Sequence, residues 1–436
     1  MGLGDRVKTM TEKKPGKHDA YAVLKLKDFR LFLTFRFFMT IAAQMQSIIV
    51  GWQVYELTHD PLSLGFIGLA EAIPFLTVAL YSGHIADRFN RKKIILWFDV
   101  VFLISSFLLL IITYKSTGII GKFGVLPIYL CVALSGLARA FLYPATIALM
   151  AQIVPRSLYT NSSTWNSTTW QVAAMTGPAI GGLLYGFFGI KVAYMAVIIS
   201  MTISFLLLTN VKSRPVPFIE EQETIMQRLA NGIRFVFSSQ LLLGAMALDM
   251  FAVLFGGATA MLPVFAGEVL KVGPEGLGIL RAAPMVGAVL MSIVLAYRPP
   301  LVRAGRLLMI GVAGFGVSII CFALSHNFYL SLALLALSGA FDNISVVIRS
   351  ATMQLVAPDK MRGRIASVNS IFIGSSNEIG SFESGVAAKL MGLIPSVIFG
   401  GMMTLGIVGA TFRWAPKLRN LNLKTITNPV EVDPEE

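Results

Sequence analysis

Residues Leu126–Met150 read LPIYLCVALSGLARAFLYPATIALM, an apolar stretch with a single charged side chain, Arg139. A helix needs about 20 apolar residues to cross the hydrocarbon core of a bilayer, and this stretch is long enough. The whole chain of 436 residues has the same character, because 55% of it is hydrophobic and only 14% is charged. Such a composition excludes an ordinary soluble domain and predicts a membrane protein.

Eleven further runs resemble this one in length and apolarity. With it, the predicted transmembrane segments are Leu31–Leu57, Leu62–Gly83, Ile94–Tyr114, Leu126–Met150, Thr160–Phe188, Val192–Leu208, Leu241–Leu270, Gly276–Tyr297, Leu307–Leu324, Phe328–Val356, Ile365–Met391 and Pro395–Phe412. The sequence therefore predicts an all-α membrane protein with twelve transmembrane helices in two six-helix bundles.

A polar stretch separates the two sets of six. We place a cytoplasmic N-terminal segment at 1–28, the bundles at 29–210 and 241–413, a linker at 211–240 and a cytoplasmic tail at 414–436. Within the linker, Ile225, Leu229 and Ile233 recur every four residues beside Arg228 and Arg234. This spacing predicts a short amphipathic helix that lies on the membrane surface.

The net charge of +13 is explained by membrane topology. If the chain starts inside and alternates, the outside loops hold only Lys115, Lys122, Lys191, Lys271 and Lys389. Positive charge is retained on the cytoplasmic side, so we expect a multi-pass membrane protein with both termini in the cytoplasm. The charge is spread over many loops, which argues against a nucleic-acid partner.

Cysteine and histidine give no sign of a metal site. Cys131 and Cys321 lie alone in separate apolar runs, and the four histidines lack zinc spacing. We expect neither a metal nor another cofactor.

The two halves of the chain are similar to each other. GLAEAIP at Gly68–Pro74 matches GILRAAP at Gly278–Pro284, and LSGLARAF at Leu134–Phe141 matches LSGAFDNI at Leu337–Ile344. Each half has an even number of helices, so the repeats run parallel. This duplication is typical of a two-bundle transporter.

Charged residues within the apolar runs exchange sign between the halves. The aligned positions are Glu71 with Arg281, Arg139 with Asp342, and Arg36 with Asp249 or a residue within one turn of it. A charge at the bilayer centre costs at least roughly 2.5–3.5 kcal/mol, so these groups should pair or face water. Our hypothesis is a Glu71–Arg139 pair and an Arg281–Asp342 pair; the alternative is static ion pairs that only hold the bundles together.

The loop after the second run reads GHIADRFNRKK, Gly83–Lys93. Its pattern resembles the cytoplasmic loop signature of the major facilitator superfamily, although Ile85 and Asn90 depart from it. The resemblance implies a gating loop, for which solvated charge is the alternative; its residues are Gly83, Asp87, Arg88, Arg91 and Lys92.

A second motif, GPAIGG at Gly177–Gly182, resembles the Gly-Pro motif of antiporters in this superfamily. Gly177 and Gly181 share a face that suits close helix packing, and Pro178 permits a bend. Gly182 completes the motif. The alternatives are a coupling role and ordinary helix packing.

Nearly the whole chain resembles the superfamily branch that holds the enterobactin exporter and drug–proton antiporters. The stretches that carry this likeness are GLAEAIP, ALDMFAVLFGGATAMLPVFA, LRAAP, QLVAPDKMRGRIASVNS and SNEIGSFESG. The resemblance implies the major facilitator fold and proton-driven export across the inner membrane of a bacterial cell. Siderophore export and multidrug resistance are the functions typical of this branch.

Two carboxylates fall in the run Ile365–Met391. At 100° per residue, Glu383 shares a polar stripe with Asn369, Ser376, Gly380 and Ser384, and we predict that it faces the central cavity. Glu378 lies on another face, where we expect a neighbouring helix or an arginine.

A carboxylate that gains and loses an arginine partner as the bundles rock can bind and release protons. On this ground the proton-coupling candidates are Glu71, Asp249, Asp342 and Glu383. Their charge partners are Arg36, Arg139, Arg281, Arg349 and Glu378. For each, the alternative is a satisfied structural charge.

Polar and aromatic residues in three runs predict the wall of a substrate cavity. They are Gln44, Gln46, Trp52, Gln53, Asn166, Trp170 and Asn369. Aromatic walls suit planar organic substrates, whereas hydrogen bonding between helices is the competing interpretation.

Taken together, these features predict a secondary transporter that works by alternating access. No phosphate-binding loop supports ATP drive, and no nucleophile–base constellation indicates an enzyme. The expected partners are a small-molecule substrate, protons and the lipid bilayer, with the chain a monomer. An importer, a lipid or metal exporter on the same fold, and a non-transporting membrane sensor are the rival interpretations.

Overall fold

The computed structural model describes residues 21–214, 225–300, 302–358 and 361–424. Within these residues the chain is helical and has no strand. The long helices of the first half are α1 (Lys27–Thr58), α2 (Pro61–Arg88), α3 (Arg91–Ile112), α5 (Leu126–Ile153), α6 (Tyr159–Phe188) and α7 (Ile190–Thr209). Those of the second half are α9 (Gln240–Gly256), α11 (Gly273–Tyr297), α12 (Ala304–Ala323), α13 (Phe328–Val356), α14 (Arg362–Met391) and α15 (Leu393–Trp414).

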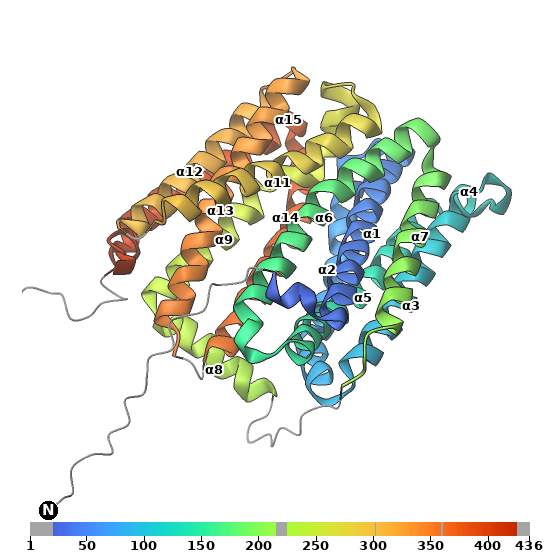
Figure 1. Cartoon of the computed structure of the whole chain (residues 1–436). Helices are drawn as coiled ribbons and strands as arrows, with labels where there is room; N and C mark the ends of the chain where they lie inside the picture. The colour runs from blue at the N-terminus through green and yellow to red at the C-terminus, as the bar shows by residue number, and fades with distance from the viewer. Residues whose placement is uncertain (1–20, 215–224, 301, 359–360, 425–436) are drawn as a thin grey trace, which may run out of the picture.

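Short elements join these helices. They are η1 (Ala22–Lys25), η2 (Lys115–Thr117), α4 (Ile119–Phe123), η3 (Arg156–Leu158), α8 (Ile225–Ser238), η4 (Ala258–Met261), α10 (Leu262–Val264), η5 (Phe265–Val269) and α16 (Pro416–Arg419). Figure 1 shows the two halves as separate groups of helices, with α6 and α11 side by side where the groups meet.

Ten helical segments in the described residues are long and apolar enough to cross a membrane. The segment Gln240–Val269 counts as one of them, although it is interrupted. The two other long helices, α6 and α14, have 30 residues each and carry too many polar side chains to qualify. Their polarity is the first sign that they face something other than lipid.

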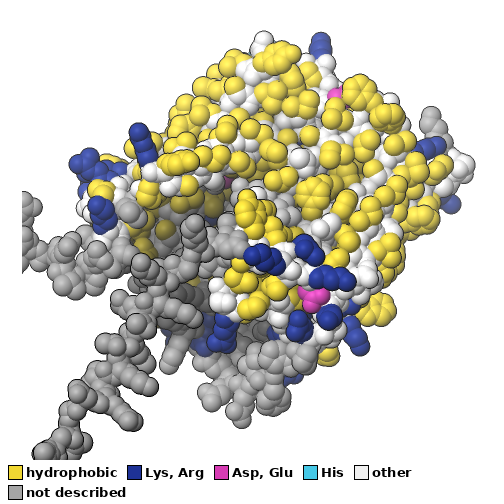
Figure 2. Space-filling view, in the orientation of Figure 1, with side chains coloured by type: hydrophobic (Ala, Val, Ile, Leu, Met, Phe, Trp, Pro, Cys, Tyr) yellow, Lys and Arg dark blue, Asp and Glu magenta, His cyan; other side chains and the backbone are white. Residues whose placement is uncertain are grey.

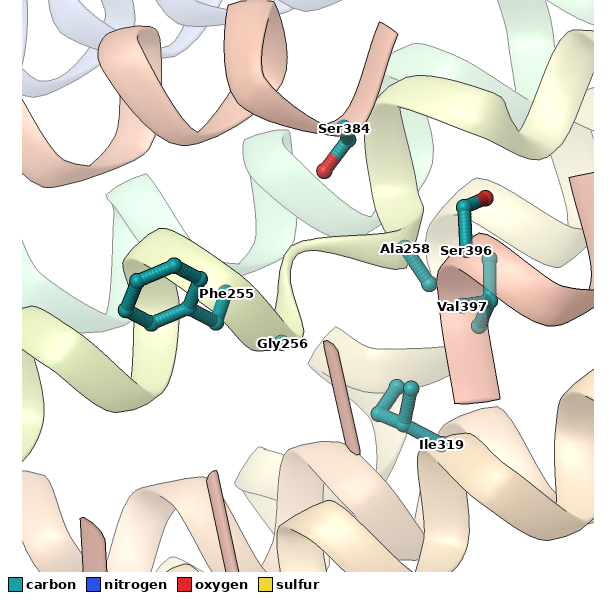
Figure 3. Close-up of a pocket in the computed structure, with 7 residues that line it drawn as sticks. All are labelled: Phe255, Gly256, Ala258, Ile319, Ser384, Ser396 and Val397. Carbon is teal, nitrogen blue, oxygen red and sulfur yellow. The ribbon is translucent and has the colours of Figure 1, made fainter. Parts of the chain in front are cut away.

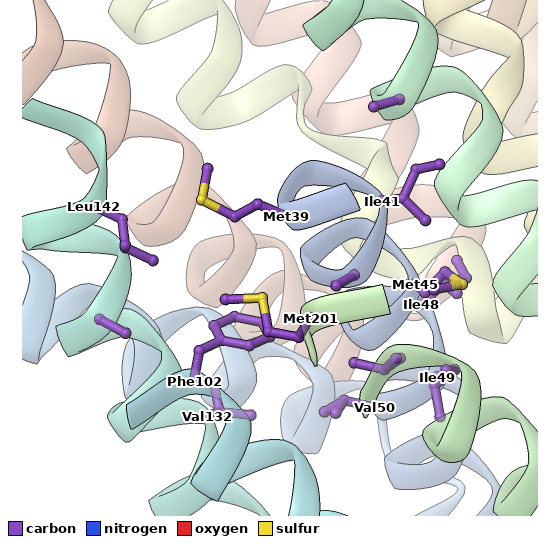
Figure 4. Packing of buried hydrophobic residues seen from close by; sticks show 14 of the residues in the cluster. Met39, Ile41, Met45, Ile48, Ile49, Val50, Phe102, Val132, Leu142 and Met201 are labelled. Carbon is purple, nitrogen blue, oxygen red and sulfur yellow. The ribbon is translucent and has the colours of Figure 1, made fainter. Parts of the chain in front are cut away.

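The interior of the first bundle is apolar. Buried side chains from α1, α3, α5 and α7 meet there, and Figure 4 shows Met39, Phe102, Val132, Leu142 and Met201 among them. Burial of such side chains between helices gives the first bundle a packed interior. Hydrophobic side chains also cover much of the outer surface in Figure 2, as a lipid-facing flank requires.

The internal repeat recurs in the packing. A Cβ at Gly136 of α5 would lie 2.6 Å from the backbone oxygen of Glu71 in α2. A Cβ at Gly339 of α13 would lie 2.6 Å from Cα of Pro284 in α11. The two LSG segments therefore use their glycines in the same way, to bring equivalent helix pairs into backbone contact.

The predicted continuous helix Leu241–Leu270 is interrupted. α9 ends at Gly256, and the chain continues through η4 and α10 into the π-helix η5. Gly257 adopts a non-helical conformation, with φ −72° and ψ 56°. The glycine pair at 256–257 explains the interruption, because glycine is the weakest helix former apart from proline.

The linker helix α8 differs from the expected surface helix. Its Gly232 and Val236 are buried against α14, where a Cβ at Gly232 would lie 3.2 Å from Val368. Ile233, which we had placed on the membrane-facing stripe, is 38% exposed next to an exposed Phe237. α8 is therefore attached to the second bundle, and only its outer edge is free to meet lipid. The side chains of Ile225, Arg228 and Leu229 lie outside those described.

Candidate substrate pathway

The two ends of the molecule differ in charge. One end of the molecule is where α1 begins and α15 ends. At this end, α2 ends at Arg88, α3 begins at Arg91, and α16 contains Lys417 and Arg419. We call this end the basic side and the other end the opposite side.

The bundles touch near the opposite side, where the first half of α2 packs against the second half of α14. A Cβ at Gly68 would lie 2.7 Å from Cβ of Ser381 and 2.8 Å from the backbone oxygen of Glu378. One turn closer to the opposite side, Cα of Gly65 would lie 2.8 Å from a Cβ at Gly385. Only glycine permits this backbone approach.

The second contact joins α6 to α11 on the same side. A Cβ at Gly182 would lie 2.7 Å from Cα of Gly278. A Cβ at Gly278 would likewise lie 2.6 Å from the backbone oxygen of Pro178. The other face of the GPAIGG motif packs within its own bundle, since a Cβ at Gly177 would lie 2.7 Å from Cβ of Gln44. Gly181 packs against α1 in the same way. The motif thus combines packing inside a bundle with contact between bundles.

Polar contacts add to this closure. Lys389 at the end of α14 forms an ion pair of 3.1 Å with Asp60, which caps α2. The hydroxyl of Tyr55 in α1 donates to Glu268 of η5 across 3.5 Å. These links are partly exposed, so they contribute little to stability and can separate readily.

A cavity of about 670 Å³ opens toward the basic side. Its wall consists of hydroxyl and amide side chains, almost all from the first half of α6, and contains no charge among the described lining residues. They are Tyr159, Thr160, Ser163, Thr164, Ser167, Thr168, Gln171 and Gln354. The helix contacts close the opposite side, so the space between the bundles is open toward the basic side.

A second cavity is far smaller, about 10 Å³, and lies inside the second bundle beside the α9 break. Figure 3 shows Phe255, Gly256 and Ser384 around it. It has room for about one water molecule and cannot hold an organic substrate.

Arg139 of α5 and Glu71 of α2 form an ion pair, as their places in the repeat led us to expect. Other charged residues lie near this pair. Glu378 of α14 interacts through its charge with Arg139 and also with Arg281 of α11. Glu378 is therefore within electrostatic range of one arginine from each bundle, next to the tight contact at Gly68.

The predicted Arg281–Asp342 pair is not formed in the described structure, and that prediction was wrong for this state. Nη1 of Arg281 instead donates to the backbone oxygen of Thr259 across 2.8 Å. The interruption of α9 leaves carbonyl groups without helical partners, and a guanidinium satisfies one of them.

Asp249 of α9 pairs with Arg349 of α13, an ion pair that sequence reasoning missed. Both side chains are at least 92% buried, and the hydroxyl of Ser345 also donates to Asp249 across 3.4 Å. We had named Arg349 as a charge partner without assigning it to Asp249. The sequence did contain a clue to this pair. Counted along their helices, Asp249 and Arg349 lie at the same depth in the membrane.

The polar stripe of α14 packs against α9 and does not line the large cavity. A Cβ at Gly380 would lie 3.1 Å from Cα of Leu254, and Ser384 donates to the backbone oxygen of Gly257 across 3.4 Å. Ser376 is buried as well. Glu383 is half-buried and lines neither cavity, so the acid at the bundle interface is Glu378.

Two residues that we predicted to line the cavity instead form hydrogen bonds inside the first bundle. Gln46 donates to Ser135 across 2.7 Å and accepts from Ser106 across 2.6 Å. Gln53 accepts from the hydroxyl of Tyr194 across 2.6 Å. Both glutamines are 4% exposed and hydrogen-bonded to side chains of their own bundle, so they hold α1 to its neighbours.

The remaining predicted cavity residues keep some exposure. Trp170 is 38% exposed, and Gln44, Trp52, Asn166 and Asn369 are half-buried. Oδ1 of Asn166 is enclosed without a hydrogen-bond partner. None of the five lines the large cavity, whose residues follow a neighbouring face of α6. The three- and four-residue spacing of Thr160, Thr164, Ser167 and Gln171 marks that face as polar, but it does not show that this face lines the cavity.

The predicted gating loop ties three helices of the first bundle together. Nε of the buried Arg91 donates to the backbone oxygen of Ala86 across 3.0 Å. Lys92 donates to the backbone oxygens of Thr209 and Val211, across 2.8 and 2.7 Å, at the end of α7. Arg88 is exposed, and the side chain of Asp87 lies outside those described. A Cβ at Gly83 would meet nothing within 4 Å, because the bundles are apart on this side.

Helices that cross a membrane, a duplicated bundle and a polar cavity closed at one end define a membrane transporter. The family comparison agrees: residues 18–430 match the model described as transmembrane secretion effector. The chain belongs to this family of the major facilitator superfamily, and it is a multi-pass membrane protein of a bacterial transporter family.

Curated relatives are distant but extend over most of the chain. The enterobactin exporter EntS of Escherichia coli O1:K1 is 23% identical over 382 residues, which are 87% of this chain and 90% of that protein. The staphyloferrin A transporter of Staphylococcus aureus strain NCTC 8325 is 21% identical over 387 residues, or 87% and 94%.

Solved structures share the fold. A D323A mutant of the nucleoside transporter NupG has a TM-score of 0.70 at 12% identity and covers 88% of this chain and 99% of its own. A bacterial homologue of the human lysosomal transporter Spinster, in an inward-facing and unoccupied conformation, has a TM-score of 0.67 at 14% identity. It covers 92% of this chain and 98% of its own.

Proposed function

We propose that this transporter exports a hydrophilic, oxygen-rich organic compound of the siderophore type from the cytoplasm, in exchange for protons. The observation that carries the proposal is the cavity wall of α6, whose side chains are hydroxyls and amides. Such groups donate hydrogen bonds to, and accept them from, a polar solute, whereas a lipophilic drug would favour an apolar pocket. Relatives named for enterobactin and staphyloferrin A support the same class.

The proposed direction follows from the charge distribution. The basic side carries the excess of Lys and Arg, which favours its placement in the cytoplasm, with both termini there. The large cavity then opens to the cytoplasm and is ready to take up a compound made inside the cell.

For proton coupling we propose Glu378 as the central carboxylate. It interacts by charge with Arg139 of the first bundle and Arg281 of the second, so its partners change when the bundles separate on the opposite side. Protonation of Glu378 weakens its hold on Arg139 and favours that separation. Glu71 competes for the same arginine, and it completes a chain of alternating charges across the interface.

The test is export from energised bacterial cells that lack other efflux systems. Cells that express the chain should release enterobactin or staphyloferrin A faster than cells with an empty vector, and a protonophore should abolish the difference. Release that is equal in both strains, for both compounds, contradicts the proposal.

A further inference from the structure

Arg36 of α1 differs from the other three arginines inside the bundles. Arg139 and Arg349 have carboxylate partners, and Arg281 donates to a backbone oxygen. Arg36 is 7% exposed, its Nε is enclosed without a hydrogen-bond partner, and no ion pair to it is found among the described residues. A buried guanidinium without a counter-ion is costly.

The internal repeat shows why this partner is absent. In the second bundle, Asp249 of α9 pairs with Arg349 of α13. In the register that aligns Arg139 with Asp342, the counterpart of Arg349 is Thr146 of α5, a neutral residue. The hydroxyl of Thr146 donates to its own helix, at the backbone oxygen of Leu142 across 2.5 Å. The first bundle thus has a cation at, or within one turn of, the position equivalent to Asp249, and the position equivalent to Arg349 is neutral.

Arg36 lies beside the space between the bundles. The phenol of Tyr143 in α5 is within electrostatic range of Arg36 and is 51% exposed. Tyr143 follows Arg139 by one turn on the same face of α5. Because Arg139 interacts with Glu378 of the other bundle, that face is directed toward the second bundle and away from lipid.

We propose that Arg36, assisted by the hydroxyl of Tyr143, binds a pair of anionic oxygens on the transported compound. A guanidinium presents paired donors that match a carboxylate or a catecholate, and the tyrosine can add one hydrogen bond. The substrate then supplies the counter-ion that the fold omits. This inference rests on the proposed function and narrows its substrate class to anions.

Binding of small probes to the purified full-length chain in detergent tests the inference without any gradient. The probes are citrate and 2,3-dihydroxybenzoate as anions, with trimethyl citrate as the neutral control. At least one anion should raise the unfolding temperature of the wild type, and trimethyl citrate should not. If neither anion stabilises the wild type, or if the neutral ester does so equally, the inference is wrong.

Three variants assign the effect to the side chain. Arg36→Gln should weaken anion binding at least about tenfold, the scale of a lost charged hydrogen bond. Arg36→Lys should retain part of the affinity, and Arg30→Gln, an exposed arginine of the same helix, should bind as the wild type does. Unchanged affinity in Arg36→Gln would overturn the inference.

The unfolding temperature without a probe separates binding from a structural role. Arg36→Gln removes an unpaired buried charge, so this temperature should stay the same or rise; a clear fall would assign Arg36 to folding. The export assay fails or succeeds independently. If the anions bind at Arg36 but cells show no proton-dependent release, only the proposed function is contradicted. If cells do show that release but Arg36→Gln binds the anions as tightly as the wild type, only this inference is contradicted.

Discussion

Asp249 and Arg349 are the most deeply buried ion pair described in the molecule. Both belong to the second bundle, so the pair need not separate when the bundles move. We therefore interpret it as a structural pair, although Asp249 was one of our proton-coupling candidates.

Removing one member of this pair leaves an uncompensated buried charge. Asp249→Asn should destabilise the protein by about 3–5 kcal/mol, and the double variant Asp249→Asn with Arg349→Gln should recover much of that loss. Thermal unfolding in detergent measures both. A double variant as unstable as the single one would show that the charges do not interact.

For Glu378 we predict a role in transport instead of stability, because its arginine partners come from two bundles. Glu378→Gln should abolish proton-driven transport while leaving exchange of substrate between the two sides of the membrane intact. Glu383→Gln is the matched control on the same helix and should retain proton drive. Proteoliposome flux with and without a pH gradient distinguishes these outcomes, and loss of drive only in Glu383→Gln would place the proton site there instead.

For single residues, the sequence predicted contacts that follow from the repeat and from the cost of a lone charge in a membrane. It failed where the contact depended on the position of another helix. The Glu71–Arg139 pair followed from the repeat and the cost of lone charges in a membrane. The Arg281–Asp342 pair did not form, since it depended on an uninterrupted helix at Gly257. Gln46 and Gln53 looked like substrate contacts because composition cannot show which way a polar side chain turns.

Among the elements, the two interface pairs α2–α14 and α6–α11 close the opposite side. Their contact surfaces are built from glycine and other small residues, so the helices meet at backbone distance. Contacts of this kind are broken by a single added side chain without loss of the individual helices.

Gly278→Leu should therefore prevent closure on the opposite side. A Cβ there would lie 2.6 Å from the backbone oxygen of Pro178, and no flexible side chain is available to move aside. We expect transport to be lost and the opposite side to become accessible to a thiol reagent at Ser381→Cys. Gly406→Leu on α15, where a Cβ meets nothing within 4 Å, is the control. Full transport by Gly278→Leu would show that this contact is dispensable.

The existence of these elements was largely predictable, and their contacts were not. Hydropathy located the apolar runs, and it also placed α6 and α14, which are too polar for a strict membrane criterion. The interruption of α9 and the docking of α8 on α14 depend on tertiary contacts that periodicity does not contain. The same holds for the α6 face that lines the cavity, because several polar faces of that helix were equally plausible.

For the whole molecule, the arrangement is asymmetric about the membrane plane. The opposite side is closed by two helix contacts and an exposed ion pair, and the basic side holds the cavity of about 670 Å³. Gly83 is free of neighbours at the basic end of α2, whereas Gly65 and Gly68 at the other end are in close contact. A rocking motion that exchanges these two environments would carry a bound compound across the bilayer.

Transport by purified protein in liposomes tests the central claim most directly. The basic side of the inserted protein would be identified by protease access to the chain termini, and the liposomes would carry a pH gradient of either sign. We predict that enterobactin or staphyloferrin A moves from the basic side to the opposite side when protons are more concentrated on the opposite side, and that reversing the gradient stops this movement. Movement that is insensitive to the gradient, or absent for both compounds, would contradict proton-coupled export of a siderophore-type compound.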